Sequence, residues 1–280
     1  MKMHRLNIFL EHIYEGAAQQ DISLSQMLAE AHSAGCTGLE CDLWRLENRK
    51  EMSAVFSENQ MTAASVYNMY DFVNTPLNES TEKIKHHLET AAYFGAKTVL
   101  AIPGFIREAD NEERALHSMY TALDRMCGEA KQYGITVTLE DFDDLYSPCR
   151  NTEGLLMFMK NVPDLRVTFD TGNFAYVLEN TAEAYDALKP YIAHVHLKDR
   201  SFDSQRADKD KTNHKADISG RLMYPCESGD GCCGLADIVK RLIADGYSGS
   251  FSIEHFGAAD QLSYMKRSAE NIRKLLKKGE

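Results

Sequence analysis

Residues 166–199 read RVTFDTGNFAYVLENTAEAYDALKPYIAHVHLKD, and this stretch contains the pattern on which the fold prediction rests. It begins with a short apolar strand over 166–173 and ends with a second one over 193–199. Short apolar runs that are bounded by polar turns are typical of strands buried in a parallel sheet. Each of these two strands delivers ionisable residues near its end, which is unusual for a buried element.

The same unit recurs along the whole chain. Eight strands are predicted, over 5–10, 38–43, 61–70, 98–104, 135–141, 166–173, 193–199 and 249–257. Apolar residues at 3–4 spacing predict amphipathic helices over 23–34, 81–94, 111–133, 235–245 and 260–277. Several of these helices end at a glycine, such as Gly35 or Gly134, which adopts the left-handed cap conformation without a Cβ penalty. Strands that alternate with helices pair in parallel, because each helix returns the chain to the same edge.

The predicted fold class is therefore α/β, and the predicted architecture is a single (β/α)8 TIM barrel. An open doubly wound sheet is the structural alternative. No linker rich in Pro, Gly or Ser divides the chain, so residues 1–280 are predicted to form one domain. The one conspicuous insertion lies at about 200–234, after strand seven, and is polar, charged and glycine-containing. Loops that follow barrel strands face the active end, so we expect this insertion to cover or shape the pocket.

Four consecutive predicted strands end in potential metal ligands. These are Glu140, Asp170, His196 and Glu254, on strands five to eight. In a closed barrel the four side chains converge at the C-terminal mouth, where three carboxylates repel one another and require neutralisation. One imidazole with three carboxylates suits a single divalent metal ion, Mn²⁺, Mg²⁺, Zn²⁺ or Co²⁺.

Three motifs carry a family resemblance. They are FDTGN at 169–173, HVHLKD at 194–199 and GYSGSFSIE at 246–254. In this order and spacing they resemble the xylose-isomerase-like TIM-barrel superfamily, and more narrowly its sugar phosphate isomerase/epimerase branch. The resemblance implies that Glu140, Asp170, His196 and Glu254 bind one divalent metal. It also implies that Glu140 and Glu254 are the catalytic acid/base pair on opposite faces of the substrate.

Two departures from the family pattern bear on function. Many relatives carry a histidine where this chain has Asn173, and asparagine cannot shuttle protons. The DNA-repair endonucleases of the superfamily hold three zinc ions with extra histidines near the ends of strands three and four. The corresponding segments here, 66–70 and 101–104, contain no histidine, so the sequence argues against a trinuclear site.

Further polar residues fall near the ends of the predicted strands and are candidates for substrate contacts. The predicted substrate-binding residues are Asn173, Lys198, Glu40, Asn68, His12 and Arg107. His194 shares a strand face with His196 but lies deeper, which favours a hydrogen-bonded core histidine. Lys198, Arg107 and the charges within 200–215 all leave open a phosphate group on the substrate.

The leading hypothesis is a divalent-metal-dependent isomerase or epimerase of a sugar or sugar phosphate. It would act by proton transfer through a metal-stabilised enediolate. One alternative is a metal-dependent dehydratase of a keto-inositol-type substrate, since fold does not determine chemistry. Another is a catalytically inactive sugar-binding relative, of which Asn173 would be a first sign.

Composition narrows the partners and the compartment. The 280 residues carry 31 Lys and Arg against 42 Asp and Glu, a net charge of −11, which disfavours binding to nucleic acid. No apolar run approaches the length of a membrane span, and the N-terminal segment is too short and polar for a signal peptide. We therefore expect a cytoplasmic protein whose seven cysteines are reduced thiols and whose partner is a small molecule. Homo-oligomers are compatible with the sequence.

Overall fold

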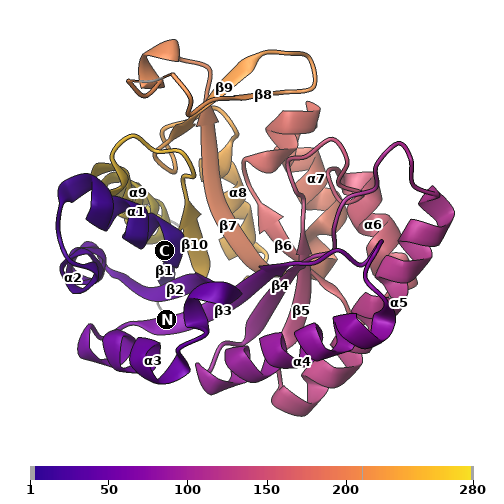
Figure 1. Cartoon of the computed structure of the whole chain (residues 1–280). Helices are drawn as coiled ribbons and strands as arrows, with labels where there is room; N and C mark the ends of the chain where they lie inside the picture. The colour runs from indigo at the N-terminus through magenta and orange to yellow at the C-terminus, as the bar shows by residue number, and fades with distance from the viewer. Residues whose placement is uncertain (1–3, 210, 279–280) are drawn as a thin grey trace.

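Eight parallel strands form a closed barrel in the computed structural model, which describes residues 4–209 and 211–278 (Figure 1). The barrel strands are β1 (Leu6–Phe9), β2 (Cys36–Asp42), β3 (Thr62–Met69), β4 (Thr98–Ile102), β5 (Thr136–Glu140), β6 (Arg166–Asp170), β7 (Ile192–Ser201) and β10 (Phe251–Glu254). Consecutive strands are neighbours, and β10 closes the barrel by pairing in parallel with both β7 and β1. The predicted (β/α)8 TIM barrel is thereby confirmed, and the open sheet is excluded.

Helices surround the barrel and cover its outer face (Figure 1). They are α1 (Leu10–Gln20), α2 (Leu24–Ala34), α3 (Arg49–Glu58), α4 (Leu77–Tyr93), α5 (Glu112–Ala130), α6 (Thr152–Asn161), α7 (Thr181–Leu188), α8 (Leu235–Ala244) and α9 (Gln261–Lys278). Each helix from α1 to α8 buries one apolar face, as α5 does with Met119, Leu123 and Met126. Gly35 ends α2 with a φ of 82°, as its position predicted. Within the described residues, no helix combines the length and apolarity that crossing a membrane requires.

Side chains alternate along each barrel strand and thereby divide the interior from the helix layer. Outward residues such as Ile8, Val167 and Ile253 belong to the apolar core under the helices. Inward residues form a buried polar layer, in which Asn7 donates to Ser252 and Thr168 donates to Thr138 over 3.1 and 2.7 Å. This hydrogen-bonded layer fills the barrel interior below the strand ends that form the C-terminal mouth.

The insertion after β7 is more regular than its composition suggests. Strand β7 continues two residues beyond the predicted end, and its last residues pair antiparallel with β9 (Leu222–Cys226). Strand β9 also pairs with β8 (Lys215–Ala216), and the two project above β7 in Figure 1. Asp199 accepts hydrogen bonds from the backbone of Gly229, Gly231 and Cys233, which ties the end of the insertion to the barrel. The seven cysteines carry free thiols in the structure.

A buried histidine, His87, joins helix α4 to the barrel. This fully buried side chain of α4 lies between the Tyr70 hydroxyl, 2.9 Å from Nδ1, and the Val66 carbonyl, 3.0 Å from Nε2. A neutral ring satisfies both partners, since Nδ1 accepts from Tyr70 while Nε2–H donates to Val66. Burial lowers the pKa of His87 from 6.5 to about 4.

Between pH 6.5 and about 4, His87 is therefore protonated in the unfolded chain but neutral in the native state. The free energy of unfolding falls as the pH is lowered through this range. We expect His87 to contribute up to roughly 3 kcal/mol of this acid destabilisation. Urea unfolding between pH 7 and 4.5 should show a weaker pH dependence for His87→Gln than for the wild type. His117→Gln, on the exposed face of α5, is the control and should follow the wild type. Equal pH dependence in all three proteins would contradict this account of His87.

Candidate active site

Four side chains meet at the C-terminal mouth of the barrel. Glu140, Asp170, His196 and Glu254 come from the ends of β5, β6, β7 and β10, and one ligand atom of each lies within 4.8 Å of the others. Strand register explains this convergence, because Asp170 pairs with His196 and Glu254 pairs with Lys198 across adjacent parallel strands. His196 Nδ1 faces the carboxylates, at 2.7 Å from Glu140 Oε1 and 3.2 Å from Glu254 Oε2. The structure thus brings together the four residues that the sequence marked as ligands.

The cluster has an unbalanced excess of buried carboxylate. Burial raises the pKa of Asp170 well above its ordinary range, and the charges of Glu254 and Glu140 add to this effect. Asp170 Oδ1 accepts from the backbone of Gly172 and Asn173, but Oδ2 is buried with no hydrogen-bond partner. A divalent cation neutralises such a set and uses carboxylate oxygen and imidazole nitrogen as ligands. The donor set and the unpartnered oxygen therefore fit a metal ion.

Glu40 lies beneath the cluster. Its Oε2 accepts hydrogen bonds from His194 Nε2 and Ser252 Oγ, at 2.8 and 2.9 Å. Its Oε1 lies 3.6 Å from His196 Nε2, an ion-pair distance, and both atoms are buried without a hydrogen-bond partner. Although burial opposes it, the neighbouring His194 and His196 lower the pKa of Glu40, which keeps this carboxylate ionised. Glu40 thus faces the Nε2 edge of the His196 ring, opposite the Nδ1 edge that faces the cluster, and is placed to orient the imidazole.

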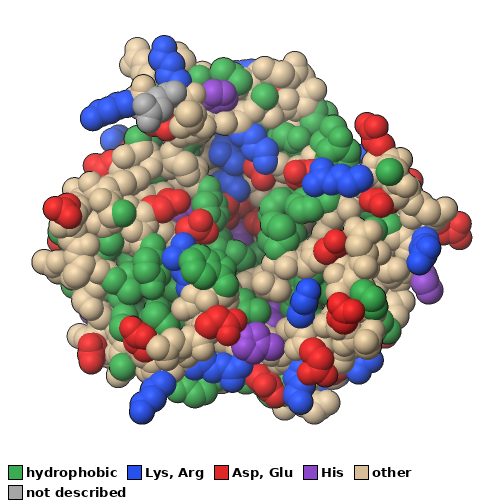
Figure 2. Space-filling model, viewed as in Figure 1, with side chains coloured by type: hydrophobic (Ala, Val, Ile, Leu, Met, Phe, Trp, Pro, Cys, Tyr) green, Lys and Arg blue, Asp and Glu red, His purple; other side chains and the backbone are tan. Residues whose placement is uncertain are grey.

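A cavity of about 460 Å³ opens directly above the cluster. Aromatic side chains, including Phe9, Tyr67 and Phe142, line one part of it. Lys198, Arg200 and Lys215 line another part, and Figure 2 shows Lys and Arg atoms gathered in the central hollow below the insertion. The insertion therefore borders the cavity, as its position after β7 led us to expect.

Two of the predicted substrate-binding residues line this cavity. Asn173 is buried there, and its Oδ1 has no hydrogen-bond partner. Lys198 contacts Glu254 Oε1 and lies 4.0 Å from Asp170 Oδ2. Burial by itself would lower the pKa of Lys198, but Glu254, Asp143 and Asp170 raise it above its ordinary value. A charged Lys198 therefore stands between the cluster and the cavity.

The structure does not place the other four predicted substrate-binding residues on the cavity wall. Glu40 is one layer too deep, and Asn68 alternates with Tyr67 and Met69, whose side chains do line the cavity. His12 is buried in α1, where its Nε2 accepts from the backbone of His255.

Arg107 is the fourth of these residues. It is exposed, with its guanidinium 4.4 Å from the centre of the Tyr146 ring. Arg107 is not among the residues that line the cavity, and Asp110 accepts a hydrogen bond from its backbone over 2.6 Å. We therefore do not include Arg107 among the residues that face a bound substrate.

Sequence reasoning missed several residues that the fold brings to the cavity. Asp143, Phe142 and Phe256 follow barrel strands by two or three residues and line the cavity wall. Their closeness to the strand ends was the available signal, but loop residues do not follow strand alternation. Arg200 and Lys215 were noted only as members of a charged segment, and the sequence does not reveal that they meet.

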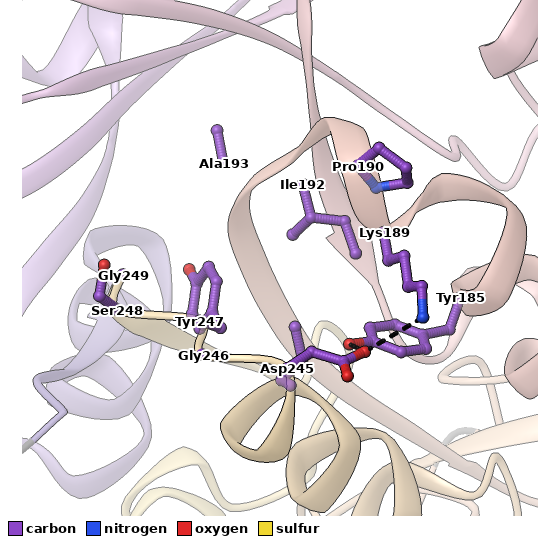
Figure 3. A pocket seen from close by; sticks show the side chains of 11 residues that line it. Tyr185, Lys189, Pro190, Ile192, Ala193, Asp245, Gly246, Tyr247, Ser248 and Gly249 are labelled. Carbon is purple, nitrogen blue, oxygen red and sulfur yellow. Dashed lines mark hydrogen bonds and ion pairs between the residues drawn. The ribbon is translucent and has the colours of Figure 1, made fainter.

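A larger cavity, of about 740 Å³, lies at the opposite end of the barrel, between the starts of β7 and β10. Its ionisable groups satisfy one another: Asp245 accepts from Tyr185 over 2.9 Å and lies 3.5 Å from Lys189 (Figure 3). Active sites of TIM barrels sit at the C-terminal mouth, whereas the N-terminal end serves stability. The cavity above the cluster is therefore the candidate active site.

The fold and the site define a TIM barrel with one acidic cluster around a histidine at its mouth. More specifically, the chain belongs to the family described as xylose isomerase-like TIM barrel, which it matches over residues 28–275.

Individual relatives are distant. The chain is 22% identical over 250 residues to an inosose dehydratase of Geobacillus thermodenitrificans, covering 84% of this chain and 82% of that protein. It is similar in structure to a D-allulose 3-epimerase of a Methylomonas species in complex with D-allulose, with a TM-score of 0.74, 15% identity and 98% of each chain covered. A xylose isomerase-like TIM barrel protein of Mycobacterium smegmatis in complex with magnesium has a TM-score of 0.72, with 16% identity, over 99% of this chain and 97% of that one. At these identities the structural likeness establishes the fold.

Proposed function

We propose that the protein is a divalent-metal-dependent isomerase or epimerase of a sugar or sugar phosphate. The observation that carries this proposal is the convergence of Glu140, Asp170, His196 and Glu254 under a cavity of small-molecule size. Similar folds support it, since one relative is a 3-epimerase bound to D-allulose and another binds magnesium.

Glu140, Asp170, Glu254 and His196 Nδ1 would hold the metal ion, with Mn²⁺, Mg²⁺, Zn²⁺ and Co²⁺ as the candidates. When bound, such an ion polarises a substrate carbonyl and stabilises the negative charge that develops on its oxygen. Glu40 keeps the His196 ring in position through the Nε2 edge.

Glu140 and Glu254 are the proposed proton carriers. One glutamate removes the proton next to the carbonyl, and the other returns a proton from the opposite face, which inverts that carbon. Return of the proton to the neighbouring carbon would instead give isomerisation. Lys198 contacts Glu254, and the free amide oxygen of Asn173 is available to accept a hydrogen bond from a substrate hydroxyl.

A dehydratase is the second candidate, favoured by the similarity to an inosose dehydratase over most of both chains. The same proton abstraction followed by loss of a hydroxyl group would yield a product lighter by one water. Mass spectrometry of the product separates the two reactions, because isomerisation and epimerisation conserve mass.

The metal site is tested by replacing a proposed ligand. Metal content per chain, measured by mass spectrometry after chelation and reloading with Mn²⁺, should be about one for the wild type. We expect Asp170→Asn to lose most of this metal, because the variant removes the charge of a proposed ligand. Asp217→Asn is the control, since Asp217 is a buried aspartate of the insertion outside the cluster. Full occupancy in Asp170→Asn, or absence of metal from the wild type, would refute the site.

The role of Glu40 is tested separately. Glu40→Gln should weaken Mn²⁺ binding by about 10- to 100-fold, because loss of a partner behind a ligand histidine leaves the imidazole less well oriented and less basic. Titration calorimetry measures this change. Glu227→Gln, a buried glutamate that pairs with Arg206, is the matched control. Wild-type affinity in Glu40→Gln would mean that the carboxylate only satisfies the core.

Proton transfer is tested by isotope exchange. Incubation of the loaded protein with ketoses and ketose phosphates in D₂O should place deuterium next to the carbonyl of a substrate. Glu140→Gln and Glu254→Gln should each reduce this uptake by 10²-fold or more, a typical contribution of a general acid or base. Glu227→Gln should exchange normally. Retained exchange in both active-site variants would overturn the mechanism.

A further inference from the structure

We propose that the candidate active site contains an oxyanion subsite, formed by Arg200 and Lys215, which binds a phosphate or carboxylate group of the substrate. This inference rests on the proposed function for the statement that the ligand is a sugar derivative. The subsite itself is formed by side chains whose positions do not depend on that function. An anion-binding subsite narrows the proposed substrate class to acidic sugars, that is, sugar phosphates or sugar acids.

Arg200 and Lys215 meet on one carboxylate. Arg200 Nη2 donates to Asp143 Oδ2 over 2.9 Å, and Lys215 Nζ lies 3.0 Å from Asp143 Oδ1. All three residues line the cavity above the cluster. They come from three separate places in the chain: the end of β7, the loop after β5 and strand β8 of the insertion. Figure 2 shows the corresponding concentration of Lys and Arg atoms beside acidic atoms in the hollow.

Arg200 has donors to spare. Its side chain is only 8% exposed, yet its Nε has no hydrogen-bond partner. The bond to Asp143 is the only one that its guanidinium donates to the part of the chain that the structure describes. A guanidinium carries five N–H donors in a rigid fork, which matches the oxygens of phosphate and carboxylate. Because Arg200 lines the cavity and its guanidinium makes one bond within the described residues, to Asp143, further N–H donors of the fork remain for an oxyanion.

The local charge favours an anion. Two cations share the single carboxylate of Asp143, so one positive charge is left without a counter-charge in this group. Burial acts to raise the pKa of Asp143, but Lys198, Arg200 and Lys215 hold it below its usual value. The Asp143 carboxylate therefore stays ionised. Lys198 contacts Glu254, whereas Arg200 and Lys215 share one carboxylate, so these two cations are the ones that an incoming anion would bind.

Strand β7 gives the subsite its place relative to the cluster. His196, Lys198 and Arg200 are spaced by two residues and all line the cavity. At about 3.3 Å per residue, the Cα atoms of His196 and Arg200 are roughly 13 Å apart. A polyol whose carbonyl lies at the cluster therefore extends along Lys198 toward Arg200, where its acidic end would bind.

The insertion completes the subsite. Strand β9 pairs with the end of β7, with Arg200 opposite Pro225, and β8 pairs with β9 through Lys215 and Met223. These pairings carry Lys215 over the cavity to Asp143. The four cluster residues lie on barrel strands, whereas the subsite depends on an added segment, so the subsite would determine substrate choice rather than chemistry.

The test is an anion titration of the full chain by calorimetry, with inorganic phosphate, gluconate and, as the neutral control, glucose. It is carried out on chelated protein and again after loading with Mg²⁺, so that binding to a metal is separated from binding to Arg200 and Lys215. We expect phosphate or gluconate to bind in both states and glucose to bind much more weakly. Stronger binding of phosphate would indicate sugar phosphates as substrates, and stronger binding of gluconate would indicate sugar acids.

Four variants assign the binding to these residues. Lys215→Gln and Arg200→Lys should each weaken anion binding by roughly tenfold, the second because it keeps the charge but loses the fork. Asp143→Asn should strengthen binding several-fold, because it removes the carboxylate that competes for both cations. Lys189→Gln is the matched control, a lysine paired with Asp245 in the cavity at the opposite end, and should bind like the wild type. Thermal unfolding followed by circular dichroism verifies that each variant is folded.

Two results would overturn the subsite: no anion binding to the chelated chain, or equal binding in Lys215→Gln, Arg200→Lys and wild type. Neither result would affect the metal and deuterium experiments that test the proposed function. Conversely, loss of metal binding or isotope exchange with intact anion binding would refute the isomerase proposal and leave the subsite standing.

Discussion

Three carboxylates and one imidazole, buried together at the mouth of the barrel, are the constraint on which the surrounding structure depends. Charges removed from water repel one another strongly unless partners compensate them. Here the compensation is arranged in layers. Lys198 contacts Glu254, backbone N–H groups hold Asp170 Oδ1, and Glu40 faces the far edge of His196. The remaining negative charge of Glu140, Asp170 and Glu254 lies at the centre of the cluster, where the proposed cation would bind.

Strand β7 organises this arrangement along one face. His194 binds Glu40 in the supporting layer, His196 belongs to the cluster, Lys198 stands above it and Arg200 reaches the proposed subsite. This order follows from strand alternation, because residues two apart share a face and successive layers of the barrel stack along its axis. A single strand therefore links the packed interior, the candidate metal site and the proposed anion subsite.

The barrel and the insertion contribute different parts of the candidate site. The family fold supplies a rigid ring of strand ends, and the same ring supports epimerases and dehydratases among proteins of similar structure or sequence. The insertion after β7 is tied down by Asp199 and by the pairing of β9, and it places Lys215 beside the cavity. Differences in such loops are the physical means by which one scaffold selects different substrates.

By itself the sequence determined the barrel, through eight repeated strand and helix units, and the convergence of Glu140, Asp170, His196 and Glu254, because strand ends of a parallel barrel meet at one mouth. Only the tertiary structure decided which nearby side chains reach the cavity. Asn68 is turned away by strand alternation, Glu40 lies one layer too deep, and Arg107 is exposed beside Tyr146, outside the cavity wall. The meeting of Arg200, Asp143 and Lys215 depends on register and on the path of the insertion, which are set by long-range packing rather than by local pattern.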